Sequence, residues 1–265
     1  MQRIVAPIDR ERPAVQDSID VIKTQMTKFL KAQKTGIIEQ VIQSYEKINK
    51  VDDAGIVASL TIDWSELVKP LAENLVSMAL DGAIQASIQI TLTDDVSSNA
   101  LSLVNDKAVA WANDRAAELV GMKWVDGELV ENPNVEWCIT QSTRDMIRRD
   151  VTEAIQDGLS NNELADTLEE NYAFSAERAE VIARTETAFA DMNGNMLTYK
   201  EAKKLGIDIK KKWHTAGDAS VSQDCIDNSN QGAIDLGIAF QSGAQMPPDH
   251  PNCRCTILPI IDEDQ

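Results

Sequence analysis

The sequence predicts an α+β protein that is mainly α-helical, with a small β-containing Cys/His module at its C-terminal end. Apolar residues recur at spacings of three and four over most of the chain, which is typical of helices. Only residues 206–265 combine candidate strands with three of the four cysteines and both histidines. Aromatic residues, at 5%, are also too few to favour a strand-rich fold.

Charge and hydropathy argue against several classes of protein. The 265 residues include 25 Lys and Arg against 43 Asp and Glu, and the net charge of −18 argues against a surface that binds DNA or anionic lipid everywhere. No apolar run approaches the roughly 20 residues of a membrane span. Arg3 and Asp9 interrupt any apolar signal segment, so we expect the protein to stay in the cytoplasm, where cysteines remain thiols or bind metal.

The first predicted domain is a helical region over residues 1–121. The apolar spacing predicts a helix over residues 14–49, and Asp63-Trp-Ser-Glu66 has the pattern of a capping box that begins a second helix. A third helix, over residues 96–120, is expected to end at Gly121, because glycine suits a left-handed C-terminal cap.

A hairpin and linker over residues 122–140 separate this region from the C-terminal domain, which we expect over residues 141–262. Asp126-Gly127 between apolar flanks is the strongest short-range signal of a hairpin. In the C-terminal domain we expect three helices and then two short strands. The helices are expected at residues 142–156, from Ser160 to about Tyr172, and from Ser175 to Lys203-Lys204. Ser160 begins the second of these helices in a capping box with Glu163. The strands are expected at residues 207–213 and 255–258.

The sharpest local pattern is Pro247-Pro-Asp-His250-Pro-Asn-Cys253-Arg-Cys255. In an extended segment Cys253 and Cys255 point to the same face, so two thiolates and a nearby imidazole could converge on zinc. Cys225 is the best candidate for a fourth ligand, which predicts a structural zinc site of Cys225, His250, Cys253 and Cys255. Two other interpretations stay open, namely buried thiols with a hydrogen-bonded histidine, and a disulfide.

The catalytic patterns that could use such residues are absent from the sequence. A zinc deaminase would need His-x-Glu with Pro-Cys-x-x-Cys, and a zinc protease would need His-Glu-x-x-His. There is also no P-loop, no G-x-G-x-x-G after a strand and no G-x-S-x-G. We therefore expect no catalytic residues and no enzymatic activity.

The helix after Ser175 carries a second candidate constellation around Arg184-Thr-Glu186. At about 100° per residue, Glu186 and Asn193 fall on one stripe with small residues, so that stripe should pack closely. A carboxylate on a packing face needs a partner, so we expect Glu186 and Asn193 to bond to the C-terminal module. Arg184 lies on the opposite side of the helix, four residues after Glu180, as in a surface ion pair.

A basic patch stands out in this acidic chain between residues 200 and 212. It sets six lysines against Glu201 and Asp208, and these lysines are Lys200, Lys203, Lys204, Lys210, Lys211 and Lys212. The simplest interpretation is the basic last turn of a helix followed by a solvated strand. Contact with nucleic acid or with an acidic partner is the functional alternative.

Residues 142–259 carry an ordered set of motifs that resembles a known family. The set includes Arg178-Ala-Glu, Ile182-Ala-Arg184-Thr-Glu186, Asn193, Trp213 and Pro247-Pro-x-His250-Pro-x-Cys253-Arg-Cys255. It resembles the C-terminal domain of the minor head proteins of tailed phages, the phage Mu F-like head-morphogenesis family. The chain departs from that pattern at Ser222, which takes the place of the first cysteine of a Val-Cys-x-x-Cys segment. If that cysteine pair binds metal in the family, this chain has lost a ligand.

The resemblance implies a non-enzymatic minor component of a phage head that acts in head morphogenesis. Such proteins enter the procapsid in few copies, associate with the portal, and affect assembly and the passage of DNA. The implied partners are the portal protein, a scaffold or major capsid protein and, at the lysine patch, phage DNA, with no membrane. The implied location is the virion, in the head interior near the portal, after assembly in the host cytoplasm.

Two other functions stay open on the sequence alone. An enzyme or a DNA-binding effector module would use Arg184, Glu186 and the Cys/His cluster. We expect no further domain after Cys255, an expectation that argues against a fused effector. The environment of Glu186 discriminates between these functions, because an open pocket beside Arg184 or His250 would favour an enzyme, and burial would not.

Overall fold

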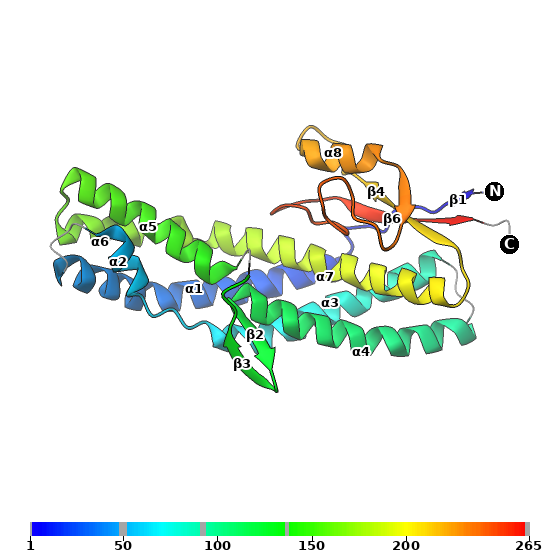
Figure 1. Ribbon diagram of the computed structural model, residues 1–265, viewed down its shortest axis with the longest axis horizontal. Coiled ribbons are helices and arrows are strands. Elements are labelled where there is room, and N and C mark those ends of the chain that lie inside the picture. Colours follow the sequence, from blue (N-terminus) through cyan, green and yellow to red (C-terminus); the bar gives the residue numbers. More distant parts are fainter. Residues whose placement is uncertain (1, 48–51, 91–93, 136–137, 263–265) are drawn as a thin grey trace. The chain divides into compact units, whose positions relative to one another are not determined.

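The chain consists mainly of helices with two small antiparallel sheets, as a computed structural model describes it over residues 2–47, 52–90, 94–135 and 138–262 (Figure 1). The predicted α+β, mainly α class is thus confirmed. Among these residues the structure contains no helix that could serve as a membrane span.

Segments that are distant in the sequence gather in two compact units. Unit 1 consists of Met1–Val21, Ala72–Ala112 and Val181–Gln265, and unit 2 consists of Ile22–Leu71 and Asn113–Glu180. Four long helices contribute residues to both units, namely α1 (Pro13–Lys47), α3 (Val68–Gln89), α4 (Asp94–Leu119) and α7 (Ala176–Lys204). The units therefore do not follow the expected boundaries near residues 121 and 141, because helices of 22 to 35 residues are long enough to serve two units.

Unit 2 contains the predicted hairpin and several shorter helices. Its further elements are α2 (Asp53–Ala58), β2 (Met122–Val125), β3 (Glu128–Glu131), α5 (Ile139–Asp157) and α6 (Asn161–Glu169). Strands β2 and β3 pair about Asp126 and Gly127, which both have the positive φ that such a tight turn requires. The capping box of Ser160 and Glu163 at the start of α6 is also confirmed.

The predicted capping box at Asp63 is wrong. The Asp63 carboxylate accepts a hydrogen bond from the backbone N–H of Ser65, at 3.0 Å, and so closes a local turn. A short 3₁₀ helix, Ser65–Leu67, follows, and α3 begins only at Val68. The aspartate side chain thus satisfies the backbone two residues on rather than capping an α-helix.

A buried arginine joins α5 to the first turn of α7 in unit 2. Arg178 is 4% exposed. Its guanidinium donates at 2.6 to 3.0 Å to Thr143 Oγ1, Ser142 Oγ and the carbonyl oxygens of Ile139 and Ala173. Burial lowers the pKa of Arg178 to about 10. Four acceptors around one buried cation make this arginine part of the architecture rather than of a binding surface.

Unit 1 contains a four-stranded antiparallel sheet in the order β1-β6-β4-β5. Its strands and adjoining helix are β1 (Gln2–Ile4), β4 (Ile209–His214), α8 (Gln223–Asn230), β5 (Ala233–Asp235) and β6 (Thr256–Asp262). The two predicted strands are confirmed as β4 and β6, which pair directly, and β1 adds the N-terminal segment to β6. Strands β1 and β5 and helix α8 were not predicted, because elements of three to eight residues are too short to show a clear period.

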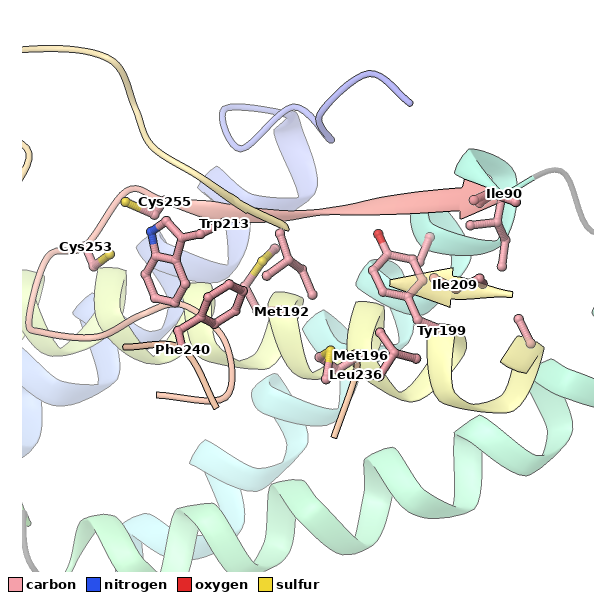
Figure 2. Close-up of a cluster of buried hydrophobic side chains, with 14 of the residues drawn as sticks. Ile90, Met192, Met196, Tyr199, Ile209, Trp213, Leu236, Phe240, Cys253 and Cys255 are labelled. Carbon is pink, nitrogen blue, oxygen red and sulfur yellow. The ribbon is translucent and has the colours of Figure 1, made fainter. Parts of the chain in front are cut away.

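An apolar cluster fills the space between this sheet and the helices of unit 1 (Figure 2). Its members come from α3 and the residue after it, α7, β4, α8, the stretch between β5 and β6, and β6, and include Ile90, Met192, Met196, Tyr199, Ile209, Trp213 and Ile257. The Tyr199 hydroxyl donates to Oε1 of Gln89 at 2.6 Å, so the one polar end of this ring is satisfied. Cys253 and Cys255 lie at the end of the cluster that contains Trp213 (Figure 2), and Cys225 Sγ lies 3.7 Å from Cys253 Sγ.

Helices α3 and α7 approach each other in unit 1 closely enough for their backbones to touch. A Cβ atom on Gly194 would lie 1.9 Å from the carbonyl oxygen of Ala79, and one on Gly82 would lie 2.3 Å from the carbonyl oxygen of Asp191. The Thr198 hydroxyl donates across the same contact to a carbonyl oxygen of α3, at 3.3 Å. This approach therefore depends on the missing side chain at both glycines.

An ionic cluster joins α1, α3 and α7 in unit 1. The Arg12 guanidinium donates to Asp81 at 2.5 and 2.8 Å and to Asp191 at 2.8 and 3.2 Å. The Asp191 side chain is only 1% exposed. Burial raises the pKa of Asp191, and its hydrogen bond with Arg12 offsets part of that rise. Arg12 is therefore the main partner of a carboxylate that water does not reach.

Candidate functional site

Three of the four predicted ligand residues, the cysteines, come together at one end of the sheet in unit 1, and the fourth, His250, contacts Cys225. The Sγ atoms of Cys225, Cys253 and Cys255 all lie within 4.8 Å of one another. Cys225 Sγ is 3.7 Å from Cys253 Sγ and 3.5 Å from Nε2 of His250. The cysteines are free thiols, and 3.7 Å is far from the ~2.05 Å of a disulfide bond, so the disulfide interpretation is wrong for this structure.

Two tight local structures hold these side chains in place. Residues 250–253 form a turn, in which the Cys253 N–H donates to the His250 carbonyl at 3.2 Å and Asn252 has a φ of 63°. Proline at the second position and a positive φ at the third are typical of a type II turn. Cys225 lies in the first turn of α8, where Ser222 Oγ accepts from its N–H at 3.3 Å. Ser222, the residue that departs from the family pattern, is thus the N-terminal cap of α8.

The partners of the cluster orient its ligand atoms. Nδ1 of His250 lies 2.9 Å from the carbonyl oxygen of Pro251. Because a carbonyl only accepts, Nδ1 carries the proton and Nε2 presents its lone pair to Cys225. The buried indole nitrogen of Trp213 has no hydrogen-bond partner among the described residues, and Figure 2 shows it on the side of the ring nearer Cys255.

The three thiols hold their protons unequally. A hydrogen bond from Cys255 lowers the pKa of Cys253 to about 5. The same contact and burial raise the pKa of Cys255 well above its ordinary range, and burial raises the pKa of Cys225. One thiolate therefore forms readily, whereas further negative charge beside it is unfavourable without a cation.

Charged side chains surround this cluster. Arg10 donates to the carbonyl oxygen of Cys255, and Arg254 forms an ion pair with Asp218 through two bonds of 2.6 and 2.7 Å. A cavity of about 340 Å³ lies beside Cys253, and Arg10 and Arg254 are among its lining residues. The site is thus bordered by cationic groups in a chain of net charge −18.

Arg10 is a site residue that sequence reasoning missed. It precedes α1 and stands 245 residues from Cys255, and no local pattern connects the two. The pairing of β1 with β6 is what brings the N-terminal segment to this end of unit 1. The other histidine, His214, is exposed at the end of β4. The histidine that contacts the cysteine cluster is His250.

The predicted motif residues of α7 have different environments. Glu186 is completely buried, as its position on the packing stripe predicts, and it does not line the cavity, whereas Arg184 does. Asn193 is half-buried, and its Oδ1 has no hydrogen-bond partner among the described residues, so the predicted bond of Asn193 to the C-terminal module does not use this oxygen. The neighbouring Thr185 connects α7 to the C-terminal module, because its Oγ1 accepts from the Asn252 N–H at 3.0 Å.

The six predicted contact lysines do not form one exposed surface. Three are exposed at the end of α7 and two are half-buried on β4, namely Lys200, Lys203, Lys204, Lys210 and Lys212. The prediction of Lys211 as a contact residue is wrong, because this lysine is completely buried. Alternation along β4 turns Lys211 to the same face as Ile209 and Trp213. Its Nζ donates to the carbonyl oxygen of Gln245 at 2.6 Å and lies 5.0 Å from the ring centre of Phe240, and burial lowers its pKa to about 8.

Comparisons with known proteins identify a family match and a curated relative. Residues 145–258 match the family described as Phage Mu protein F like protein, which confirms the resemblance for this region and supports a phage head protein. A curated relative, the NAD(+)–arginine ADP-ribosyltransferase EFV of Enterococcus faecalis (strain ATCC 700802 / V583), is 30% identical over 131 residues, 45% of this chain. The chain covers 27% of that relative's length. No solved structure shows a significant match.

Proposed function

Because the C-terminal region of this chain is phage Mu F-like, we propose that the protein is a minor head protein of a tailed phage. It acts in head morphogenesis without enzymatic activity, in the head interior near the portal, after assembly in the host cytoplasm. Its partners are the portal protein, a scaffold or major capsid protein, and phage DNA during packaging or ejection. The observation that carries this proposal is the family match over residues 145–258.

The environment of Glu186 supports the non-enzymatic part of the proposal. A catalytic carboxylate has to reach a substrate, whereas Glu186 is 0% exposed and lies outside the cavity that Arg184 lines. An enzyme or effector module that uses Arg184, Glu186 and the Cys/His cluster is the alternative. The transferase activity in the relative's name belongs to a protein of which this chain covers 27%, so it gives that alternative little support.

Quantitative mass spectrometry of purified heads from the encoding phage, both DNA-filled and emptied, tests the proposal. We expect a few copies in each DNA-filled head, with cross-links to the portal protein. Loss of these copies from emptied heads would indicate that the protein leaves with the DNA, and retention would indicate a lasting place at the portal. Complete absence from both kinds of head would contradict the proposal and favour the enzyme alternative.

The exposed lysines support a contact with phage DNA as part of this role. We define the lysine surface as Lys200, Lys203 and Lys212, which are exposed or half-buried on α7 and β4. Lys203 forms an exposed ion pair with Asp235, at 3.3 Å, which a phosphate can replace at little cost. The remaining surface of the chain is acidic enough that DNA contact has to be local.

Replacing the three residues of the lysine surface by glutamine should weaken binding to double-stranded DNA. The slope of log affinity against log salt should fall by up to about 3, because each phosphate contact contributes about 0.9. The matched control is Lys28→Gln, Lys31→Gln and Lys69→Gln, which removes the same charge from exposed positions of α1 and α3. Fluorescence anisotropy at several salt concentrations measures both variants, and equal affinities would rule out this surface as the DNA contact.

A further inference from the structure

We propose that Cys225, Cys253, Cys255 and His250 bind one zinc ion in a closed structural site. The proposal concerns how the C-terminal module of unit 1 is held together. It does not rest on the role in the phage head, and either proposal can fail without the other.

The distances from Cys225 to Cys253 and to His250 agree with a tetrahedral zinc site. With Zn–S bonds of about 2.3 Å and Zn–N bonds of about 2.0 Å, tetrahedral angles place two sulfur atoms about 3.8 Å apart and a sulfur and a nitrogen about 3.5 Å apart. The observed separations are 3.7 Å between Cys225 Sγ and Cys253 Sγ and 3.5 Å between Cys225 Sγ and His250 Nε2. Cys255 Sγ lies within 4.8 Å of the other two sulfur atoms, whereas His250 is not within that distance of all three, so its ring has to move toward Cys253 and Cys255 when the ion binds.

The donor set is one that structural zinc sites use. Three thiolates and one imidazole fill all four positions of a tetrahedral ion, so no position remains for a catalytic water. Soft thiolate ligands favour zinc over magnesium or calcium, which prefer oxygen. His250 already presents the unprotonated Nε2 that such a bond needs, because its Nδ1–H donates to the Pro251 carbonyl.

The groups around the site suit its charge. Zn²⁺ with three thiolates has a net charge of −1, and binding releases the thiol protons to solvent. The Arg10 guanidinium donates to the Cys255 carbonyl and lies close enough to Cys253 and Cys255 for their charges to attract it. The Trp213 indole N–H, which has no partner among the described residues, lies nearest to Cys255, whose thiolate would accept its hydrogen bond.

The site joins segments that have little regular structure of their own. Its ligands come from the first turn of α8, from the turn at residues 250–253 and from the residue before β6. The described stretch between β5 and β6 contains neither helix nor strand. An ion that ties this stretch to α8 would close a long loop, and closure of a long loop in the folded state stabilises it.

Metal analysis of the full chain tests the proposal directly. The protein is purified from cells grown with zinc, exchanged into metal-free buffer, and measured by inductively coupled plasma mass spectrometry. We expect about one zinc per chain and a lower melting temperature after treatment with a chelator. Only traces of metal, or iron with inorganic sulfide in place of zinc, would overturn the proposal.

Serine substitutions locate the ion. Cys225→Ser should abolish stoichiometric zinc, whereas Cys138→Ser should retain it. Cys138 is the matched control because it is also buried but lies in unit 2, where its side chain caps α5, and serine is a better cap than cysteine. Equal zinc content in the two variants would overturn the assignment of these ligands.

Cobalt provides a measurement that does not depend on whether any variant folds. Co²⁺ added to the unchanged, metal-free chain should give the strong visible bands of a tetrahedral ion and sulfur-to-cobalt charge-transfer absorption. Because Trp213 adjoins the site, tryptophan fluorescence should fall in the same titration. Weak bands typical of octahedral cobalt, without charge transfer, would show that the thiolates do not bind metal.

Discussion

Arg12→Met is expected to destabilise the protein by about 3 to 5 kcal/mol near pH 7. The substitution keeps much of the apolar volume of the side chain but leaves Asp191, which is 1% exposed, without its hydrogen-bonded cation. Removing one partner of a buried ion pair destabilises a protein more than replacing both partners by apolar residues, because the remaining charge has no water to solvate it. Chemical denaturation of both proteins, monitored by far-ultraviolet circular dichroism, measures the difference.

The deficit of this variant should depend on pH. Burial already raises the pKa of Asp191, and removal of Arg12 removes the hydrogen bond and the charge that hold it down, so it should rise further. An acid with a raised folded pKa contributes stability below its unfolded pKa and loses that contribution as the pH rises through the folded value. The difference between variant and parent should therefore shrink as the pH falls from about 7 to about 5.

Two further variants separate this effect from a general loss of packing. Adding Asp191→Asn to Arg12→Met removes the stranded charge and should recover much of the lost stability at neutral pH. Arg148→Met breaks the exposed ion pair with Asp53 in unit 2 and should have a much smaller effect. A loss of stability in Arg12→Met that does not change with pH, and that Asp191→Asn does not relieve, would contradict the role of Arg12 as the partner of the Asp191 carboxylate.

Gly194→Ala is expected to destabilise the protein by about 3 kcal/mol. Its Cβ would lie 1.9 Å from the Ala79 carbonyl oxygen and 2.8 Å from the Ala83 nitrogen, and both are backbone atoms that cannot rotate away. Helices α3 and α7 would have to separate, which would also weaken the bond from Thr198 to the Ala83 carbonyl. At roughly 2 to 4 °C per kcal/mol for a chain of this size, the melting temperature should fall by about 6 to 12 °C.

Gly36→Ala is the matched control for this substitution. Gly36 is exposed in the interior of α1, and a Cβ atom there would meet no other atom within 4 Å. Alanine has the higher helix propensity, so this variant should be more stable than the parent by about 0.5 to 1 kcal/mol. Opposite signs for the two glycine substitutions are the expected result, and a Gly194→Ala protein as stable as the parent would mean that α3 and α7 do not touch as described.

The lysines of residues 200–212 show what a residue pattern can and cannot predict about side-chain exposure. Sequence reasoning treated the six lysines of residues 200–212 as one patch, although the alternation of Ile209, Lys211 and Trp213 was present in the sequence. That period of two predicts one common face, and the structure buries all three side chains on it. The signal was available and was outweighed by the expectation that lysine is exposed.

The candidate metal site was predictable in its members but not in its geometry. The spacing of His250, Cys253 and Cys255 indicated shared chemistry, and Cys225 was the best fourth member. The spacing in the sequence could not distinguish a metal site, in which the four side chains converge, from separate buried thiols. The distance from Cys225 to the other three residues depends on where α8 lies. Arg10 could not have been found at all, since it reaches Cys255 only through pairing between the two ends of the chain.

The sequence by itself determined the fold class, the hairpin at Asp126-Gly127, the capping box at Ser160 and the ends of most long helices. These features depend on side-chain periodicity and on backbone preferences within a few residues, which a sequence states directly. Only the tertiary structure decided that Gly194 has to be glycine, that Arg12 neutralises Asp191, and that Cys225 meets both Cys253 and His250. Those contacts join residues from 25 to 179 positions apart, and their geometry is set by packing of whole elements rather than by local pattern.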